Sequence, residues 1–375
     1  MSEPQIVVIG LGATGSAVFY QLARRGIRTA GIEQFDIGHD RGSSHGPTRI
    51  FRLAHYENPA YVPLLRRARE LWRELETICG QKLLVTTGIA ELGPPGGELV
   101  PGTLAAAARH DLPHEVLDAK ALMRRYPAFR ISESTIAVNQ PDGGYIEAAA
   151  ALHAYIRAAT DAGAVVHTGE KVVALEPHRN GVRIATDRGQ IEADGAVVAA
   201  GPWLAKVLPD LRLPLRVTRQ VVGWFEPDEA RQFAADRFPV FLLETRRGIH
   251  YGLPYYGGIG LKVAKHHHFN EAADPDGYDM AVSAADEAAI RAPLAEFLPG
   301  ANGRLLAAQP CLYTMTPDET FIIDSLPSYP QVVIASPCSG HGFKFSPVVG
   351  EIVADLITAG TTRHDIAPFR LGRFS

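Results

Sequence analysis

The hydrophobic pattern at the start of the chain predicts a strand, a tight turn, a helix and a second strand. Residues 5–9 form a β-branched apolar run, and residues 16–25 place apolar side chains three and four positions apart. Gly26 ends this helix, and residues 29–32 form another short apolar run. The order of these elements is that of a βαβ unit.

The helical spacing of apolar residues and the short apolar runs typical of strands both recur later in the chain. Residues 61–76 and 146–162 predict long helices, the first strongly amphipathic and the second rich in alanine. Strands are predicted at residues 165–167, 171–175, 182–186, 196–199 and 332–335 and over most of residues 215–316, with helices at residues 284–297 and 347–359.

The chain has 375 residues, more than one hydrophobic core usually spans, so we predict two domains. Residues 83–145 are rich in Gly and Pro around short strands, which marks a change of organisation. We predict that residues 1–82, 146–213 and 317–375 form a dinucleotide-binding domain. Residues 83–145 and 214–316 are predicted to form a substrate domain that is interleaved with it.

Composition favours a globular protein with a small-molecule partner. Apolar residues make up 46% and charged residues 21%, and the formal net charge is -4. This charge gives no electrostatic reason to expect nucleic acid or an anionic membrane as partner. Residues 6–23 carry no charge, but their three glycines in a turn pattern argue against a membrane span or a signal peptide.

The cysteines and histidines exclude two kinds of site. Cys79, Cys311 and Cys338 make neither a disulfide framework nor a CxxC pair, and they fit a reducing cytoplasm. The three consecutive histidines that begin at His266 have no acid or cysteine at ligand spacing. We therefore predict no metal site.

A glycine motif carries the first functional prediction. Gly10, Gly12 and Gly15 stand between the first strand and its helix, where a turn needs positive φ and a pyrophosphate approaches the backbone closely. Glu33 follows roughly 20 residues later, at the tip of the next strand, where a carboxylate can bind the hydroxyls of a ribose. The motif predicts a bound dinucleotide without choosing between NAD and FAD.

Three other segments suit a flavin. Residues 42–52 form a loop with small residues, hydrogen-bond donors and two arginines. A glycine turn at residues 251–254 leads to Lys262 and His266. The Ser-Gly-His-Gly-Phe-Lys segment at residues 339–344 follows a buried strand and precedes a helix, so that its backbone can contact a flavin ring.

These segments resemble the family of monomeric sarcosine oxidase and N-methyl-tryptophan oxidase, the small flavin amine oxidases. The resemblance covers nearly the whole chain, including residues 200–203 and 368–371. It implies an α/β fold in which a glutathione-reductase-like FAD-binding Rossmann domain is interleaved with a mixed-sheet substrate domain. It also implies a monomer.

The resemblance assigns roles to single residues. Cys311, in a Cys-Leu-Tyr-Thr segment, corresponds to the cysteine that bonds to the 8α-methyl of FAD, whereas Cys338 is expected to be a packed thiol. Arg52 and Lys344 correspond to the residues that hold the substrate carboxylate. Lys262 corresponds to the lysine over the flavin face that assists the reaction with oxygen.

Other positions follow in the same way. Arg49 corresponds to an arginine that lies against the flavin, and His45, Tyr251, His266 and Tyr313 correspond to pocket residues that contact or orient the amine. The expected cofactor-binding residues are Gly10, Gly12, Ala13, Thr14, Gly15, Glu33, Gln34, His39, Gly42, Ser43, Thr48, Arg49, Val172, Ala200, Gly201, Trp203, Cys311, Gly340, Gly342, Phe343 and Lys344.

The sequence departs from the family at the pocket. Ser44 and Pro47 replace a histidine and an acidic residue in the arginine loop. Residues 246–247 are arginines where the family has small or apolar residues, His250 replaces a tyrosine, and Lys265 precedes His266. We expect these positions to form the pocket roof and to alter the preference for the substrate side chain.

The resemblance implies an FAD-dependent oxidase that converts a small secondary amino acid such as sarcosine to an imine, with oxygen as acceptor and hydrogen peroxide as product. N-methyl-tryptophan and pipecolate are alternative substrates, and a flavin dehydrogenase that feeds a quinone is an alternative enzyme. Outside the flavin enzymes, the glycine motif also fits an NAD-linked dehydrogenase or a non-catalytic dinucleotide sensor.

Overall fold

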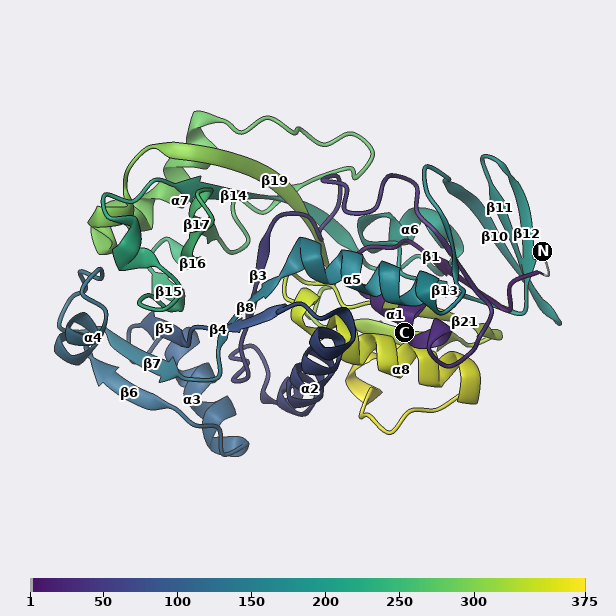
Figure 1. Cartoon of the computed structure of the whole chain (residues 1–375), viewed down its shortest axis with the longest axis horizontal. Helices are drawn as coiled ribbons and strands as arrows, with labels where there is room; N and C mark the ends of the chain where they lie inside the picture. The colour runs from purple at the N-terminus through teal and green to yellow at the C-terminus, as the bar shows by residue number, and fades with distance from the viewer. Residues whose placement is uncertain (1–2, 375) are drawn as a thin grey trace.

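The computed structural model describes residues 3–374, in which four β-sheets form the framework (Figure 1). One sheet has six strands in the order β20-β21-β13-β1-β2-β9, and all neighbours except β20 and β21 are parallel. Its strands are β1 (Ile6–Ile9), β2 (Thr29–Ile32), β9 (Val165–His167), β13 (Gly195–Val198), β20 (Ile322–Leu326) and β21 (Tyr329–Ser336).

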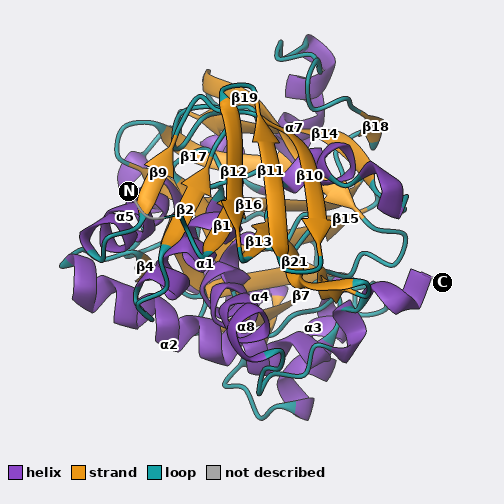
Figure 2. Ribbon diagram, turned by 90° about the vertical axis from the view of Figure 1, so that its right-hand side faces the viewer, coloured by secondary structure: helices purple, strands orange, loops and turns teal. Residues whose placement is uncertain are grey.

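Helices cover one face of this sheet, and a small antiparallel sheet covers the other (Figure 2). The helices are α1 (Ala13–Ala23), α2 (Val62–Cys79), α5 (Ala148–Asp161) and α8 (Ser346–Ala359). The small sheet consists of β10 (Val172–His178), β11 (Gly181–Thr186) and β12 (Gly189–Ala193). Successive side chains of β1 point to opposite faces of the sheet. Val8 therefore packs with the helices, while Val7 and Ile9 pack against the small sheet.

A nine-stranded mixed sheet forms the other half of the molecule, on the left of Figure 1. Its strands are β5 (Ile89–Gly93), β6 (Glu115–Asp118), β7 (Ile136–Gln140), β14 (Arg216–Phe225), β15 (Val240–Thr245), β16 (Gly248–Tyr256), β17 (Gly260–Lys265), β18 (Glu271–Ala272) and β19 (Leu305–Met315). The helices α3 (Leu99–Arg109), α4 (Ala119–Arg125) and α7 (Ala284–Phe297) pack on it.

A three-stranded sheet of β3 (Thr48–Phe51), β8 (Gly144–Glu147) and β4 (Leu84–Thr86) lies between these halves (Figure 1). A short helix, α6 (Leu204–Val207), and a 3-10 turn at Phe343–Phe345 complete the elements near the site. This sheet places Thr48, the first residue of β3, beside the nine-stranded sheet, where its carbonyl oxygen accepts from Nζ of Lys262 on β17 at 2.9 Å.

The α/β fold and most predicted elements are confirmed. The helix predicted at residues 284–297 coincides with α7, whereas α1 begins at Ala13, three positions before the predicted start. Two predictions are wrong. The loop predicted at residues 42–52 contains β3, and the region 83–145 contains α3 and α4 besides strands. Within residues 3–374, no helix is both long and apolar enough to cross a membrane.

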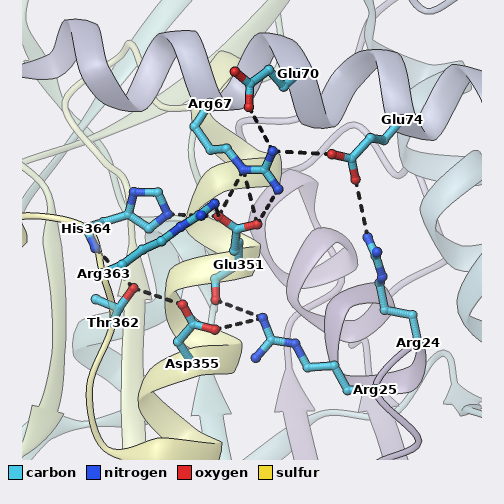
Figure 3. Close-up of polar contacts among 10 residues, drawn as sticks. All are labelled: Arg24, Arg25, Arg67, Glu70, Glu74, Glu351, Asp355, Thr362, Arg363 and His364. Atoms are coloured by element: carbon cyan, nitrogen blue, oxygen red, sulfur yellow. Dashed lines mark hydrogen bonds and ion pairs between the residues drawn. The ribbon is translucent and has the colours of Figure 1, made fainter.

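An ion-pair cluster connects α8 to α2, to the residues just after α1 and to the segment that follows α8 (Figure 3). Glu351 on α8 accepts hydrogen bonds from Arg67 on α2, at 2.7 and 3.1 Å, and from Arg363 and His364 at 3.1 and 2.8 Å. On the neighbouring turn of α8, Asp355 pairs with Arg25 at 2.8 Å. Burial alone would raise the pKa of Glu351, but its hydrogen bonds with His364 and Arg67 lower it well below its usual range.

Replacing Glu351 with Gln is expected to destabilise the protein by on the order of 2 kcal/mol, since Arg67 and His364 lose a largely buried partner. A carboxylate with a lowered pKa stabilises the fold above about pH 4.5, and the stabilisation is lost as the pH falls towards the folded pKa. The measurement is thermal unfolding of both proteins at fixed FAD between pH 4 and 8. Glu70→Gln, which removes an exposed partner of Arg67, is the control and should change little.

Candidate active site

A cavity of about 550 Å³ lies where the carboxyl ends of β1, β2, β13 and β21 face β14, β16, β17 and β19. Residues from Ile9 to Lys344 line it. All predicted site residues line this cavity except Gly15 and Thr48. The chain therefore brings segments far apart in sequence to one place, at the edge of a parallel sheet where α/β proteins bind ligands.

The glycine turn forms one end of the cavity. Gly10 has a φ of 87°, and a Cβ there would lie 2.7 Å from the carbonyl oxygen of Ala199. Gly15 has a different role from the one predicted, because a Cβ on it would lie 1.8 Å from the carbonyl oxygen of Gly10. Gly15 thus lets α1 pack closely on the turn and does not face the ligand space.

The N-terminus of α1 faces the cavity and suits an anion. Its first turn has no acidic residue and its N-cap Gly12 offers no capping side chain, while Ser44 Oγ accepts from the N–H of Ala13 at 3.0 Å. Glu33 is buried at the tip of β2 and accepts from the N–H groups of Leu11 and Phe35, at 2.9 and 3.2 Å. Gln34, His39, Val172, Ala200, Gly201 and Trp203 line the same end. The glycine cradle and the buried acid fit the diphosphate and ribose of a bound dinucleotide.

Cys311 lies on β19 and is buried in the cavity wall. Burial raises the pKa of its thiol, and the charges of Arg49 and Lys262 act in the opposite direction. Cys338, which was expected to be a packed thiol, also lines the cavity and lies with its Sγ 3.5 Å from the carbonyl oxygen of Thr320. The geometry brings both thiols to the cavity.

Lys262 projects from β17 into the cavity and is 3% exposed. Its Nζ donates to the carbonyl oxygen of Thr48 at 2.9 Å and lies 5.6 Å from the ring centre of Trp224. Burial, followed by the charge of Arg49, lowers the pKa of Lys262 well below its usual value. Thr48 therefore acts through its carbonyl on Lys262, and Trp224 is a cavity residue that the sequence analysis missed.

Arg52 lies at the other end of the cavity and already has a carboxylate partner. Its Nη2 donates to both oxygens of Glu57 at 2.6 Å, and its Nη1 donates to the carbonyl oxygen of Ala54 at 3.0 Å. Nη1 also lies 3.5 Å from Oε1 of Glu91. Burial would raise the pKa of Glu57, but the charge of Arg52 holds it down at about 2. Neither glutamate belongs to a motif, and the sequence analysis missed both.

Lys344 lies in the 3-10 turn before α8, and its Nζ donates to the carbonyl oxygen of His341 at 2.9 Å. Burial and the charge of Arg52 lower the pKa of Lys344 to about 7. Arg49 is held by backbone carbonyls, with Nη2 donating to Ser43 and His45 at 2.9 and 2.6 Å. Arg49 therefore fixes the shape of the loop that it belongs to.

The remaining predicted pocket residues are neutral near pH 7. Burial lowers the pKa of His266 to about 3 and that of His45 to about 4, and it raises the pKa of Tyr251 to about 12. The Nδ1 of His266 lies 3.4 Å from the hydroxyl of Tyr313. These groups can donate or accept hydrogen bonds without repelling a charged substrate.

The predicted pocket roof is wrong. Residues 246–247 form an exposed turn in which Arg247 pairs with Glu296 at 3.0 Å, and His250 and Lys265 lie outside the cavity wall. The cause is strand alternation. Ile249 and Tyr251 line the cavity, so His250 between them faces the other side of the sheet, opposite Lys265 in the β16–β17 pairing.

Comparisons with known proteins find relatives that match nearly the whole chain. The chain is 42% identical over 373 residues to "Monomeric sarcosine oxidase" of Bacillus sp. (strain NS-129), with 98% of this chain and 96% of that protein covered. It is 36% identical over 372 residues to "N-methyl-L-tryptophan oxidase" of Salmonella gallinarum (strain 287/91 / NCTC 13346), with 99% of both covered. Its fold matches that of NikD, described as an unusual amino acid oxidase essential for nikkomycin biosynthesis, with a TM-score of 0.88 at 24% identity over 99% of this chain and 98% of that one.

The family comparison decides the cofactor that the glycine motif left open. Residues 5–356 match the family described as DAO, FAD dependent oxidoreductase. The match covers the glycine turn, the cavity wall and the segment that carries Lys344. The chain belongs to the DAO family of FAD-dependent oxidoreductases.

Proposed function

We propose that the protein oxidises the CH–NH bond of a small secondary amino acid such as sarcosine and uses oxygen as the acceptor. The observation that carries this proposal is that Arg52, Lys344 and Lys262 share one cavity with the glycine turn. Two cations at one end suit a carboxylate, and a third lies on the wall beside Cys311. The names of the sarcosine and N-methyl-tryptophan oxidases support the same substrate class.

The side chains in the cavity have separate proposed roles. Arg52 and Lys344 hold the substrate carboxylate, for which Arg52 must release the Nη2 contact with Glu57. Neutral His266, Tyr251 and Tyr313 orient the amine and exclude water from it. FAD, when bound, supplies the two-electron oxidation, and hydrolysis of the resulting N-methyl imine gives the amino acid and formaldehyde. The nine-stranded sheet serves as the substrate domain, and the enzyme works as a monomer.

The first experiment is an anaerobic titration of the purified protein with sarcosine, N-methyl-tryptophan, pipecolate and proline, followed by the visible spectrum. Bleaching of the flavin band by one of them supports the proposal and identifies the substrate type. Admission of oxygen should then restore the band with one equivalent of peroxide, whereas a quinone-linked dehydrogenase would restore it slowly. A flavin band that none of the four bleaches would contradict the proposed substrate class.

The FAD is proposed to be bound covalently, through a thioether between Cys311 and the 8α-methyl group. Cys311→Ser is expected to release yellow cofactor into the supernatant when the protein is precipitated with acid, whereas the unaltered protein keeps it in the pellet. Cys338→Ser is the matched control, because this thiol is buried in the same cavity. If FAD is released from the Cys338→Ser variant and not from the Cys311→Ser variant, the thioether bond to FAD is formed by Cys338.

A further inference from the structure

Glu91 is a buried carboxylate for which neither the motifs nor the proposed mechanism has a use. It is fully buried on β5, between β15 and β7, and it does not line the cavity. Its Oε2 accepts from Nε2 of Gln140 at 2.5 Å, and Oε1 of Gln140 accepts in turn from the N–H of Ala54 at 3.0 Å. A rigid strand and a fixed amide therefore hold Glu91 against Arg52.

The two edges of the Arg52 guanidinium are in different surroundings. Nη1 faces the carbonyl of Ala54 and Oε1 of Glu91, neither of which lines the cavity. Nη2 faces Glu57, which does line it and lies in the irregular segment after β3. Substrate can therefore replace Glu57, but it cannot replace Glu91.

We propose that Glu91 is a permanent, titrating partner of Arg52 that tunes the affinity of the site for a carboxylate by taking up a proton when that carboxylate binds. The proposal rests on the proposed function, in which Arg52 receives the substrate carboxylate. Glu91 is thus a positioning residue, since it acts on substrate through Arg52. The proton comes from solvent, and no bond of the substrate changes.

The surroundings of Glu91 support a change of protonation. Oε1 has no hydrogen-bond partner among the described residues, so it can carry a proton. Burial raises the pKa of Glu91 to about 7, with Arg52 acting to lower it and Glu57 to raise it. Lys344, from the turn before α8, is the other charged group that faces it, while Thr103 on α3, Gln140 on β7 and Tyr56 are neutral.

The direction of the effect follows from linkage. A carboxylate that takes the place of Glu57 at Arg52 leaves the charge of Glu57 in the cavity wall, so the site gains one negative charge. This charge raises the pKa of Glu91 further, and binding is accompanied by proton uptake. Affinity must then fall as the pH rises through about 7. Glu91→Gln resembles the protonated form of Glu91 at every pH, so the variant lacks the pH dependence of carboxylate affinity that Glu91 causes. Lys344 also has a pKa of about 7, and the charge of Glu91 helps to raise it, so the same comparison is made in a Lys344→Met background to isolate Glu91.

The test uses the FAD-loaded enzyme and acetate, a carboxylate without an amine to oxidise. The dissociation constant is read from the flavin spectrum between pH 5.5 and 8.5. We expect Glu91→Gln and the unaltered enzyme to agree at low pH, and the variant to bind acetate about tenfold more tightly at high pH. Proton uptake on binding, measured with an indicator dye in weak buffer, should be smaller in the variant. Identical pH slopes in the two proteins would overturn the proposal.

Further measurements separate this proposal from the proposed function. Glu98→Gln is the control, because burial also raises the pKa of Glu98 although it does not contact Arg52. If acetate binds equally well to Arg52→Gln, the anchor is misplaced and the proposed function fails.

Glu91 is then tested without ligand, since a raised pKa means that its stabilisation of the fold is present at low pH and lost as the pH rises through about 7. The melting temperature of Glu91→Gln relative to the unaltered protein must therefore rise between pH 5.5 and 8.5, and a constant difference would refute the titration of Glu91. Should the variant not fold, infrared difference spectra of the unaltered enzyme must show a protonated carboxyl band on acetate binding, and its absence would overturn the proposal.

Discussion

Lys262→Met is expected to slow the reaction of the reduced flavin with oxygen by about 10²- to 10³-fold and to leave reduction by substrate nearly unchanged. The cation lies in a buried wall beside Cys311 and Trp224, where its charge is poorly screened. Negative charge develops on oxygen as it accepts electrons, and a fixed ammonium stabilises that charge. The protonated amine of Lys262 is the active form. The rate of flavin reoxidation by oxygen should therefore fall as the pH rises through the pKa of Lys262, which burial places well below 10.5.

Stopped-flow absorbance distinguishes the two half-reactions. Reduction is followed after anaerobic mixing with substrate, and reoxidation after mixing the reduced enzyme with oxygenated buffer. Lys265→Met is a matched control, because Lys265 lies on the same strand with its side chain outside the cavity wall. Equal slowing of both half-reactions in Lys262→Met would remove the proposed role in oxygen activation and would indicate a general disturbance of the site.

Arg52→Gln is expected to weaken the binding of carboxylate-bearing amines by about 100-fold, or about 3 kcal/mol, while the FAD spectrum stays intact. The variant loses a bidentate hydrogen-bond donor that no neighbouring side chain replaces, since Lys344 offers a single ammonium. It also leaves Glu57 without its cation, so the double variant Arg52→Gln/Glu57→Gln is needed to keep the buried charges balanced.

Anaerobic spectral titration with sarcosine and with dimethylamine gives the two dissociation constants for each protein. Loss of affinity should be confined to sarcosine, because dimethylamine has no carboxylate for Arg52 to bind. Arg247→Gln, which removes an exposed arginine paired with Glu296, is the control and should behave like the unaltered enzyme. Unchanged affinity for sarcosine in the double variant would show that the carboxylate anchor lies elsewhere.

Local patterns predicted the parts of the fold that local interactions determine. The strand, glycine turn and helix at residues 5–25 could be predicted because positive φ at Gly10 and helical spacing leave a local signature. The helix α3 was missed because Pro101 and Gly102 disfavour helix, yet a Cβ at Gly102 would lie 2.5 Å from the carbonyl oxygen of Tyr56. Tertiary packing therefore overrides propensity at this point.

The candidate site was predictable where a motif carried it and unpredictable where packing between distant segments created it. Glu91 lies on β5 of the nine-stranded sheet, whereas Arg52 follows β3 of the three-stranded sheet, and no spacing in the sequence encodes their contact. One signal was present, since Glu91 is a charge within the otherwise apolar strand Ile89–Gly93. Lys262 likewise lies in an otherwise apolar run, residues 260–264 of β17, but its predicted role came from the resemblance.

The walls of the cavity come from segments between Ile9 and Lys344, and this has a consequence for how the enzyme matures. A nascent chain on the ribosome can form the glycine turn early, but it cannot enclose a flavin until Lys344 has been synthesised. The complete flavin site therefore exists only after translation has passed this point, late in the chain of 375 residues. FAD that binds this completed site stabilises the folded chain by mass action, so a low concentration of FAD lowers the population of folded enzyme.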